Sequence, residues 1–180
     1  MSEAKMVLAA LADALVEQRI QQDALERIEV REELKGGESM MSAVAHRAGL
    51  QNHEFGIFKD AGFRGMYNLS LKQLVSHKGA PAGGTLYNFM GKTELAANLF
   101  RVTQTAERAH SSGATGLPQL KQTAQDVGAE VRAVMLRSSG VAPENLPIEE
   151  DISRVKRRIK SAAKGMKRLD SPSKSKTKGD

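Results

Sequence analysis

Polar side chains suited to recognising a partner are concentrated in the segment 93–105, which reads TELAANLFRVTQT. At helical spacing, Asn98, Arg101, Gln104 and Thr105 fall on one side of a predicted helix. Amide and guanidinium groups form bidentate hydrogen bonds with bases, phosphates and carboxylates, so this side is a candidate partner-binding surface. The alternatives are a solvated face, or an internal polar network in which a carboxylate holds Arg101.

A second candidate for partner binding is Arg64. It lies in the glycine-flanked sequence GFRGMY (residues 62–67), which is interpreted as a loop between two apolar anchors, Phe63 and Tyr67. An exposed arginine beside aromatic rings can bind a phosphate or a stacked base. It can equally cap the C-terminus of a helix, and the sequence leaves both interpretations open.

Positive charge is concentrated at the C-terminal end. Residues 154–180 hold eleven lysines and arginines and two acids, whereas the rest of the chain holds 16 bases and 19 acids. A final amphipathic helix is predicted over residues 148–170, and its bases would neutralise DNA phosphates without reading the sequence. The candidate nucleic-acid-binding residues are Arg154, Lys156, Arg157, Arg158, Lys160 and Lys164. The alternative is a tail that only keeps the protein soluble.

The elements that position these residues are predicted to be helices. Hydrophobic residues make up 40% of the 180-residue chain but aromatics only 4%, and tryptophan is absent. A core built from aliphatic side chains favours packed helices, so we predict an all-α protein with a single helical domain. Within residues 93–105, Leu95, Leu99 and Val102 are predicted to face this core, and Thr93 to be the N-cap.

The chain divides into four predicted parts. A long, projecting N-terminal helix covers residues 1–35 and ends at Gly36-Gly37, a helical core domain covers 36–147, the basic helix covers 148–170, and a disordered tail covers 171–180. Polar residues interrupt the apolar stripe of the first helix, which makes it too weak for a long coiled coil. Three roles stay open for it: forming a homo-oligomer, packing on its own domain, or covering a groove next to another domain.

Residues 70–105 also have the outline of a helix-turn-helix, with 93–105 as the helix that would read DNA. The connecting segment of about fifteen residues is much longer than the usual three or four. The outline is therefore weak evidence.

No pattern in the sequence indicates an enzyme. Gly91-Lys92-Thr93 looks like the end of a phosphate-binding loop, but Leu86 stands where that motif needs its first glycine. The four histidines are scattered and there is no cysteine, so no catalytic residue, metal site or cofactor is predicted. No apolar run is long enough to cross a bilayer, and the lack of cysteine fits a reducing compartment, so a cytoplasmic location is expected.

Several blocks of sequence resemble the DNA-damage-inducible protein D family. They are MGKTELAANLFRVTQT (90–105) and FGIFKDAGFRGMY (55–67), with RIEVREELK (27–35) before them and DVGAEVRAVM (126–135) and APENLP (142–147) after them. Ordered blocks of this kind are more specific than one short motif. Members of the family carry a further N-terminal domain similar to the phage BRO antirepressor type, and we expect this domain to be absent because the chain starts at its long helix.

The resemblance implies a non-enzymatic accessory factor of the bacterial DNA-damage (SOS) response. It also implies that the factor modulates recombination by binding the RecA recombinase filament, DNA, or both. The first alternative is a DNA-binding or antirepressor-like transcription regulator of phage or mobile-element origin. The second is an interaction fragment that acts on a longer relative through the shared domain.

Overall fold

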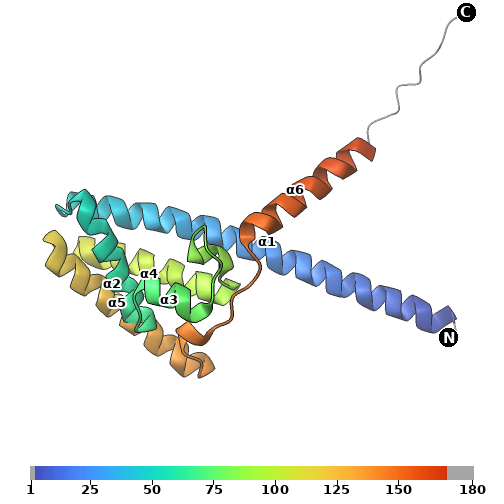
Figure 1. Ribbon diagram of the computed structural model, residues 1–180, viewed down its shortest axis with the longest axis horizontal. Coiled ribbons are helices and arrows are strands. Elements are labelled where there is room, and N and C mark those ends of the chain that lie inside the picture. The colour runs from blue at the N-terminus through green and yellow to red at the C-terminus, as the bar shows by residue number, and fades with distance from the viewer. Residues whose placement is uncertain (1–2, 170–180) are drawn as a thin grey trace, which may run out of the picture.

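Four long helices form the body of the protein (Figure 1). α1 (Glu3–Arg47) packs against α4 (Lys92–Ser111), α2 (Phe55–Tyr67) packs against α5 (Gly116–Ser139), and α4 also contacts α5. This computed structural model describes residues 3–169, and the tail predicted from residue 171 lies outside them. The described part contains no β-strand, only an isolated bridge between Met90 and Ile148, so the all-α prediction is confirmed.

Shorter elements connect the long helices. They are η1 (Asn52–Glu54), α3 (Leu71–Lys78), η2 (Leu86–Phe89) and η3 (Pro143–Asn145), and α6 (Ile152–Leu169) follows them. Ser70 is the N-cap of α3, and its side chain accepts a hydrogen bond from the Gln73 amide. The Thr93 prediction is wrong: Gly91 is the N-cap of α4. The final helix begins at Ile152, where the Asp151 carboxylate accepts from the Ser153 amide.

The core is aliphatic, as the composition predicts, with Leu34, Met66, Leu74 and Leu120 fully buried. In α4, Leu95 and Val102 are buried as predicted, and Leu99 is partly buried against the same cluster. The apolar stripe of α4 thus faces the core, and its predicted orientation is confirmed.

The prediction that the first helix ends at Gly36-Gly37 is wrong, since α1 continues to Arg47. Gly37 is buried where α1 crosses α4, and a Cβ there would lie 2.9 Å from a methyl group of Val102. Gly36 faces open space. Each glycine costs the helix about 1 kcal/mol relative to alanine, and the packing that Gly37 permits against α4 offsets this cost.

The loop predicted at residues 62–67 is instead the last part of α2. Gly65 packs against the backbone of α5 at Gln125, and Gly128 of α5 packs against Gly62 and Met66. Because no side chain stands between them at these points, the two helices approach at backbone contact distance. The glycines therefore serve helix packing and not a flexible loop.

Two helical arms extend from the body (Figure 1). Residues 3–26 of α1 run beyond the end of α4, and α6 leaves α1 at an angle, so that the two arms diverge. We call residues 3–26 of α1 and residues 156–167 of α6 the fork. The projection of the N-terminal helix agrees with the sequence prediction.

Candidate nucleic-acid interface

The polar side of α4 does not form a partner-binding surface, contrary to prediction. Asn98 and Thr105 are fully buried, and Arg101 is 2% exposed. The prediction failed because α2 and η2 cover this side of the helix with their tyrosines, which hydrogen-bond to the α4 side chains. For the same reason α4 cannot act as the reading helix of a helix-turn-helix.

Arg101 is part of an internal network. Its Nε and Nη2 donate to the Asn98 side-chain oxygen at 3.1 and 3.0 Å, and Nη2 also donates to the Tyr87 hydroxyl at 3.0 Å. The guanidinium stacks 4.7 Å from the centre of the Phe63 ring. The alternative of an internal network is therefore correct, but amide, hydroxyl and ring groups hold Arg101 where a carboxylate was expected.

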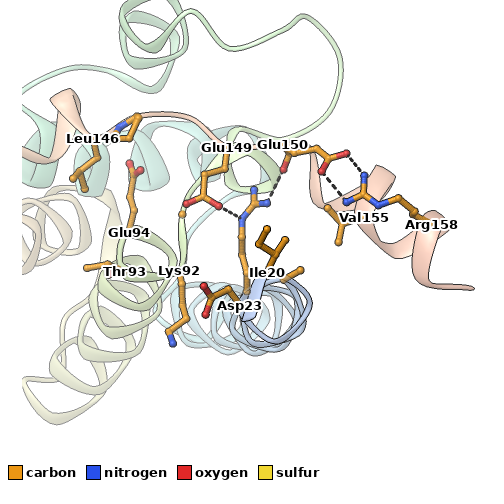
Figure 2. A pocket seen from close by; sticks show the side chains of 14 residues that line it. Ile20, Asp23, Lys92, Thr93, Glu94, Leu146, Glu149, Glu150, Val155 and Arg158 are labelled. Atoms are coloured by element: carbon orange, nitrogen blue, oxygen red, sulfur yellow. Dashed lines mark hydrogen bonds and ion pairs between the residues drawn. The ribbon is translucent and has the colours of Figure 1, made fainter. Parts of the chain in front are cut away.

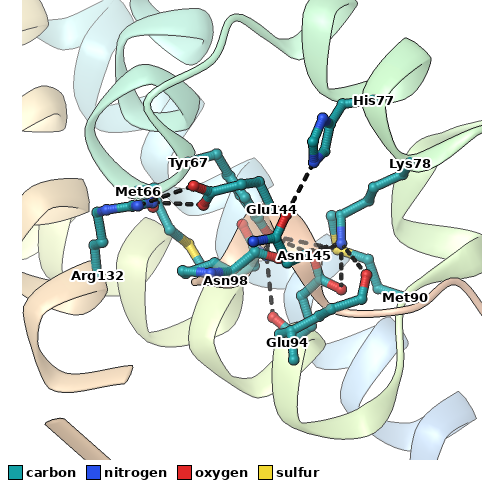
Figure 3. Close-up of polar contacts among 12 residues, drawn as sticks. Met66, Tyr67, His77, Lys78, Met90, Glu94, Asn98, Arg132, Glu144 and Asn145 are labelled. Atoms are coloured by element: carbon teal, nitrogen blue, oxygen red, sulfur yellow. Dashed lines mark hydrogen bonds and ion pairs between the residues drawn. The ribbon is translucent and has the colours of Figure 1, made fainter. Parts of the chain in front are cut away.

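A second part of the network surrounds Glu94 (Figure 3). The Tyr67 hydroxyl donates to the Glu94 carboxylate at 2.9 Å and accepts from Asn98 at 2.7 Å. Lys78, whose side chain is 1% exposed, forms an ion pair with Glu94 at 3.0 Å and donates to the Leu146 carbonyl oxygen at 2.7 Å. The network joins α2, α3 and α4 to the segment after η3.

Burial controls the protonation of this cluster. It raises the pKa of the Glu94 carboxyl, while the Lys78 charge and the Tyr67 hydroxyl act in the opposite direction. Burial, together with the nearby Glu94 charge, raises the pKa of Tyr67 well above its usual value. Both groups are held by partners within the protein, which is the arrangement of a structural network.

The sequence interpretation missed the two tyrosines, although a signal for them existed. Tyr67 and Tyr87 are the only tyrosines of the chain, and both sit in apolar sequence. A buried tyrosine needs a partner for its hydroxyl, so each indicates nearby polar side chains in the core. Asn98 and Arg101 are those partners.

The remaining predicted partner residues do not form one surface. Arg64 is exposed on α2, where it pairs with Asp60 at 2.7 Å and lies beside Gln125. Gln104 is partly buried in a different hollow, next to Phe100 and Val134. The structure therefore brings together only Asn98, Arg101 and Thr105, and it does so inside the core.

The six predicted bases of α6 lie on the surface, with Lys156 partly buried and the others exposed. Lys156 pairs with Glu32 of α1, and Arg158 forms a bidentate pair with Glu150. Within residues 3–169, no ion pair with a carboxylate involves Arg157, Lys160 or Lys164. At helical spacing these three residues form a stripe opposite the apolar side of α6. We call them the basic stripe.

Arg27 of α1 holds the segment that leads into α6 through contacts with Glu149 and Glu150, which Figure 2 labels. Its guanidinium donates to the carbonyl oxygens of Met90, Asn88 and Glu150 at 2.7, 2.8 and 2.6 Å, and its Nε lies 3.5 Å from the Glu149 carboxylate. A pocket of about 550 Å³ adjoins this anchor. Because three N–H groups of Arg27 donate to backbone carbonyl oxygens of two other segments, this buried arginine holds the root of the fork in place.

A third polar contact fixes the segment between α5 and α6. Arg132 of α5 donates to both oxygens of Glu144 at 2.6 and 2.9 Å and to the carbonyl oxygen of Met66 at the end of α2. Both side chains are 16% exposed. The hydrogen bonds from Arg132 lower the pKa of Glu144, so folding is favoured by ionisation of this carboxyl.

We expect Glu144→Gln to lower the unfolding free energy by about 1.5–3 kcal/mol at pH 7. Because the folded-state pKa of Glu144 is depressed, its contribution is present above the usual carboxyl pKa and is lost as the pH falls through the folded value. Urea unfolding of both proteins between pH 7 and pH 3 should show the difference shrinking with acidification. A difference that stays constant with pH contradicts the assignment.

The matched control is Glu130→Gln. Glu130 forms a bidentate pair with Arg108 as well, but its side chain is 61% exposed. Solvent screens such a pair, so this substitution should cost about 0.5 kcal/mol or less.

Residues 3–169 contain neither a metal site nor a membrane-spanning helix. No group of three side chains there has the arrangement of a metal site. None of the helices in that range is both long and apolar enough to span a membrane.

The comparisons with known proteins agree on one family. The family described as DinD C-terminal domain has a sequence model that matches residues 20–155 of this chain. DNA damage-inducible protein D of Escherichia coli (strain K12) is 36% identical over 139 residues, which cover 76% of this chain and 50% of the E. coli protein. The chain thus spans about half the length of that relative. The residues that the family model matches include the buried network but not the basic stripe.

Proposed function

Because the chain belongs to the family of DinD C-terminal domains, we propose that it serves the bacterial DNA-damage response as a non-enzymatic factor that binds DNA. The main support for DNA binding is the basic stripe of α6. Its three exposed bases have no carboxylate partner among residues 3–169 and lie on one side of a projecting helix, where successive phosphates of a flexible strand can reach them. Such contacts depend on charge and not on base sequence.

The proposal includes modulation of recombination through the RecA recombinase filament on single-stranded DNA. The resemblance of the sequence blocks to the DNA-damage-inducible protein D family implies this step, and the projecting arms offer long exposed helices to a filament. A role without catalysis is supported by the network, since its buried ionisable groups bind one another and the backbone. No feature of α4 favours the alternative of a sequence-reading transcription regulator, because the face that would read bases is buried.

We expect the triple substitution Arg157→Gln, Lys160→Gln, Lys164→Gln to weaken binding to single-stranded DNA about tenfold or more at low salt. The slope of log affinity against log salt should fall by about 2, at roughly 0.7 per lost phosphate contact. Fluorescence anisotropy with a labelled oligonucleotide at a series of salt concentrations measures both quantities.

The control removes the same charge from the body of the protein. Lys35, Lys72 and Lys121 are exposed, and replacing all three with glutamine should leave the salt slope almost unchanged. Equal losses in the two triple variants would mean that net charge alone drives binding and would contradict an interface on α6. Binding that persists in full after the α6 substitutions would exclude the basic stripe.

The recombinase step has its own test. Strand exchange by the RecA recombinase should change when this protein is added, and the basic-stripe variant should have a smaller effect than the control variant. If the unmodified protein binds DNA but does not change strand exchange, the recombinase step is contradicted. The proposal of DNA binding is then unaffected.

A further inference from the structure

The two arms of the fork carry exposed apolar side chains that nothing in the described chain covers. On α1 these side chains are between 52% and 66% exposed; they are Met6, Val7, Leu8, Leu11, Leu15, Val16, Ile20 and Leu25. On α6, Ile159 and Met166 are 37% and 62% exposed and continue the stripe that starts with buried Ile152 and Val155. An apolar surface of this extent marks a binding site for protein.

The charges of the two arms are opposite. Residues 3–26 contain five acids and two bases, whereas residues 152–167 contain seven bases and no acid. Within one chain the arms lie close to each other near the root, where Ile20, Asp23 and Arg158 line one pocket, and they separate beyond it (Figure 1). Beyond the root, the acidic arm is too far from the basic arm of its own chain to pair with it. The basic arm of another copy has the complementary charge.

We propose that the fork binds a second copy of this chain, with α1 of each protomer packed against α6 of the other. A twofold arrangement pairs the acidic and basic arms twice, so that both apolar stripes are covered in two helix pairs. The basic stripe lies on the opposite side of α6 from its apolar residues, so it stays accessible in the dimer.

The dimensions fit a stable dimer. At 1.5 Å per residue, the α1 arm measures about 36 Å and the α6 arm about 18 Å, and a strip of that combined length and about 10 Å width covers roughly 540 Å², of the order of the 800 Å² per partner that stable interfaces bury. Polar interruptions such as Gln18 and Gln22 weaken a long parallel coiled coil of two α1 helices. The charge pattern instead favours pairing α1 with α6.

The first test is the mass of the full chain in solution. Sedimentation velocity at 1–100 μM should show a dimer, and Leu11→Asp with Leu15→Asp should shift it to a monomer, with dimerisation at least 100-fold weaker. The control is Ile57→Asp with Val134→Asp, which changes two equally exposed side chains on α2 and α5, far from the fork, and should leave the dimer intact. A monomer of the unmodified chain at 100 μM overturns the proposal.

The second test identifies which helices pair, and it uses the absence of native cysteine. A Leu15→Cys chain and an Ile159→Cys chain are mixed and oxidised. A disulfide between the two different chains supports packing of α1 on α6. Cross-linking of the Leu15→Cys chain only with itself overturns this arrangement. Both tests work without DNA, so their outcome is independent of the proposed function.

Discussion

Replacing Arg101 with alanine is expected to lower the unfolding free energy by about 3–5 kcal/mol. The side chain is fully enclosed, so its removal leaves a cavity beside Phe63 and takes the donor away from Asn98 and Tyr87. A loss of this size is a large share of the 5–15 kcal/mol that stabilise a typical domain. Urea unfolding followed by circular dichroism measures it.

The control on the same helix is Arg108→Ala, whose side chain is 39% exposed and should cost less than about 1 kcal/mol. Below its melting temperature, Arg101→Ala should bind DNA as well as the unmodified protein does. A stability change under about 1 kcal/mol combined with a tenfold loss of DNA binding would restore the interpretation of Arg101 as a contact residue.

Replacing Gly65 with alanine is the second substitution expected to have a large effect, with a cost of about 3 kcal/mol. The new Cβ would overlap the carbonyl oxygen of Gln125 on α5, and a backbone atom cannot move aside as a side-chain end can. The two helices have to separate, which also weakens the packing around Gly128. Alanine's higher helix propensity recovers about 1 kcal/mol and does not reverse the sign.

Gly56 in the same helix is the matched control, because nothing lies within 4 Å of the Cβ that alanine would add there. Gly56→Ala should raise stability by up to about 1 kcal/mol. If Gly65→Ala and Gly56→Ala changed the thermal midpoint equally, helix propensity would explain both effects. The close contact between α2 and α5 would then make no measurable contribution to stability.

The sequence correctly predicted features that depend on residues close together in the chain. Apolar spacing in α4 placed Leu95 and Val102 in the core, and serine, a favoured capping residue, does cap α3 at position 70. These predictions hold because side-chain spacing and capping depend on a few neighbouring residues.

The failures come from contacts between segments distant in the chain. Gly37 is a helix-breaking signal by itself, and only its contact with Val102 of α4 explains why α1 continues. The polar side of α4 is indistinguishable from a solvated face until Tyr67 and Tyr87 are known to lie against it. α4 is buried on two sides, one apolar and one polar. The spacing of its apolar residues predicts burial of the apolar side and carries no information about burial of the polar side.

The placement of the two tyrosines gives the protein a natural optical reporter. The chain has no tryptophan, so its intrinsic emission comes from Tyr67 and Tyr87, and both hydroxyls are bonded inside the network. This emission follows the junction of α2, α4 and η2, whereas circular dichroism sums over all helices, including the two arms. Comparing the two signals during one thermal scan therefore distinguishes melting of the arms from melting of the body without any added label.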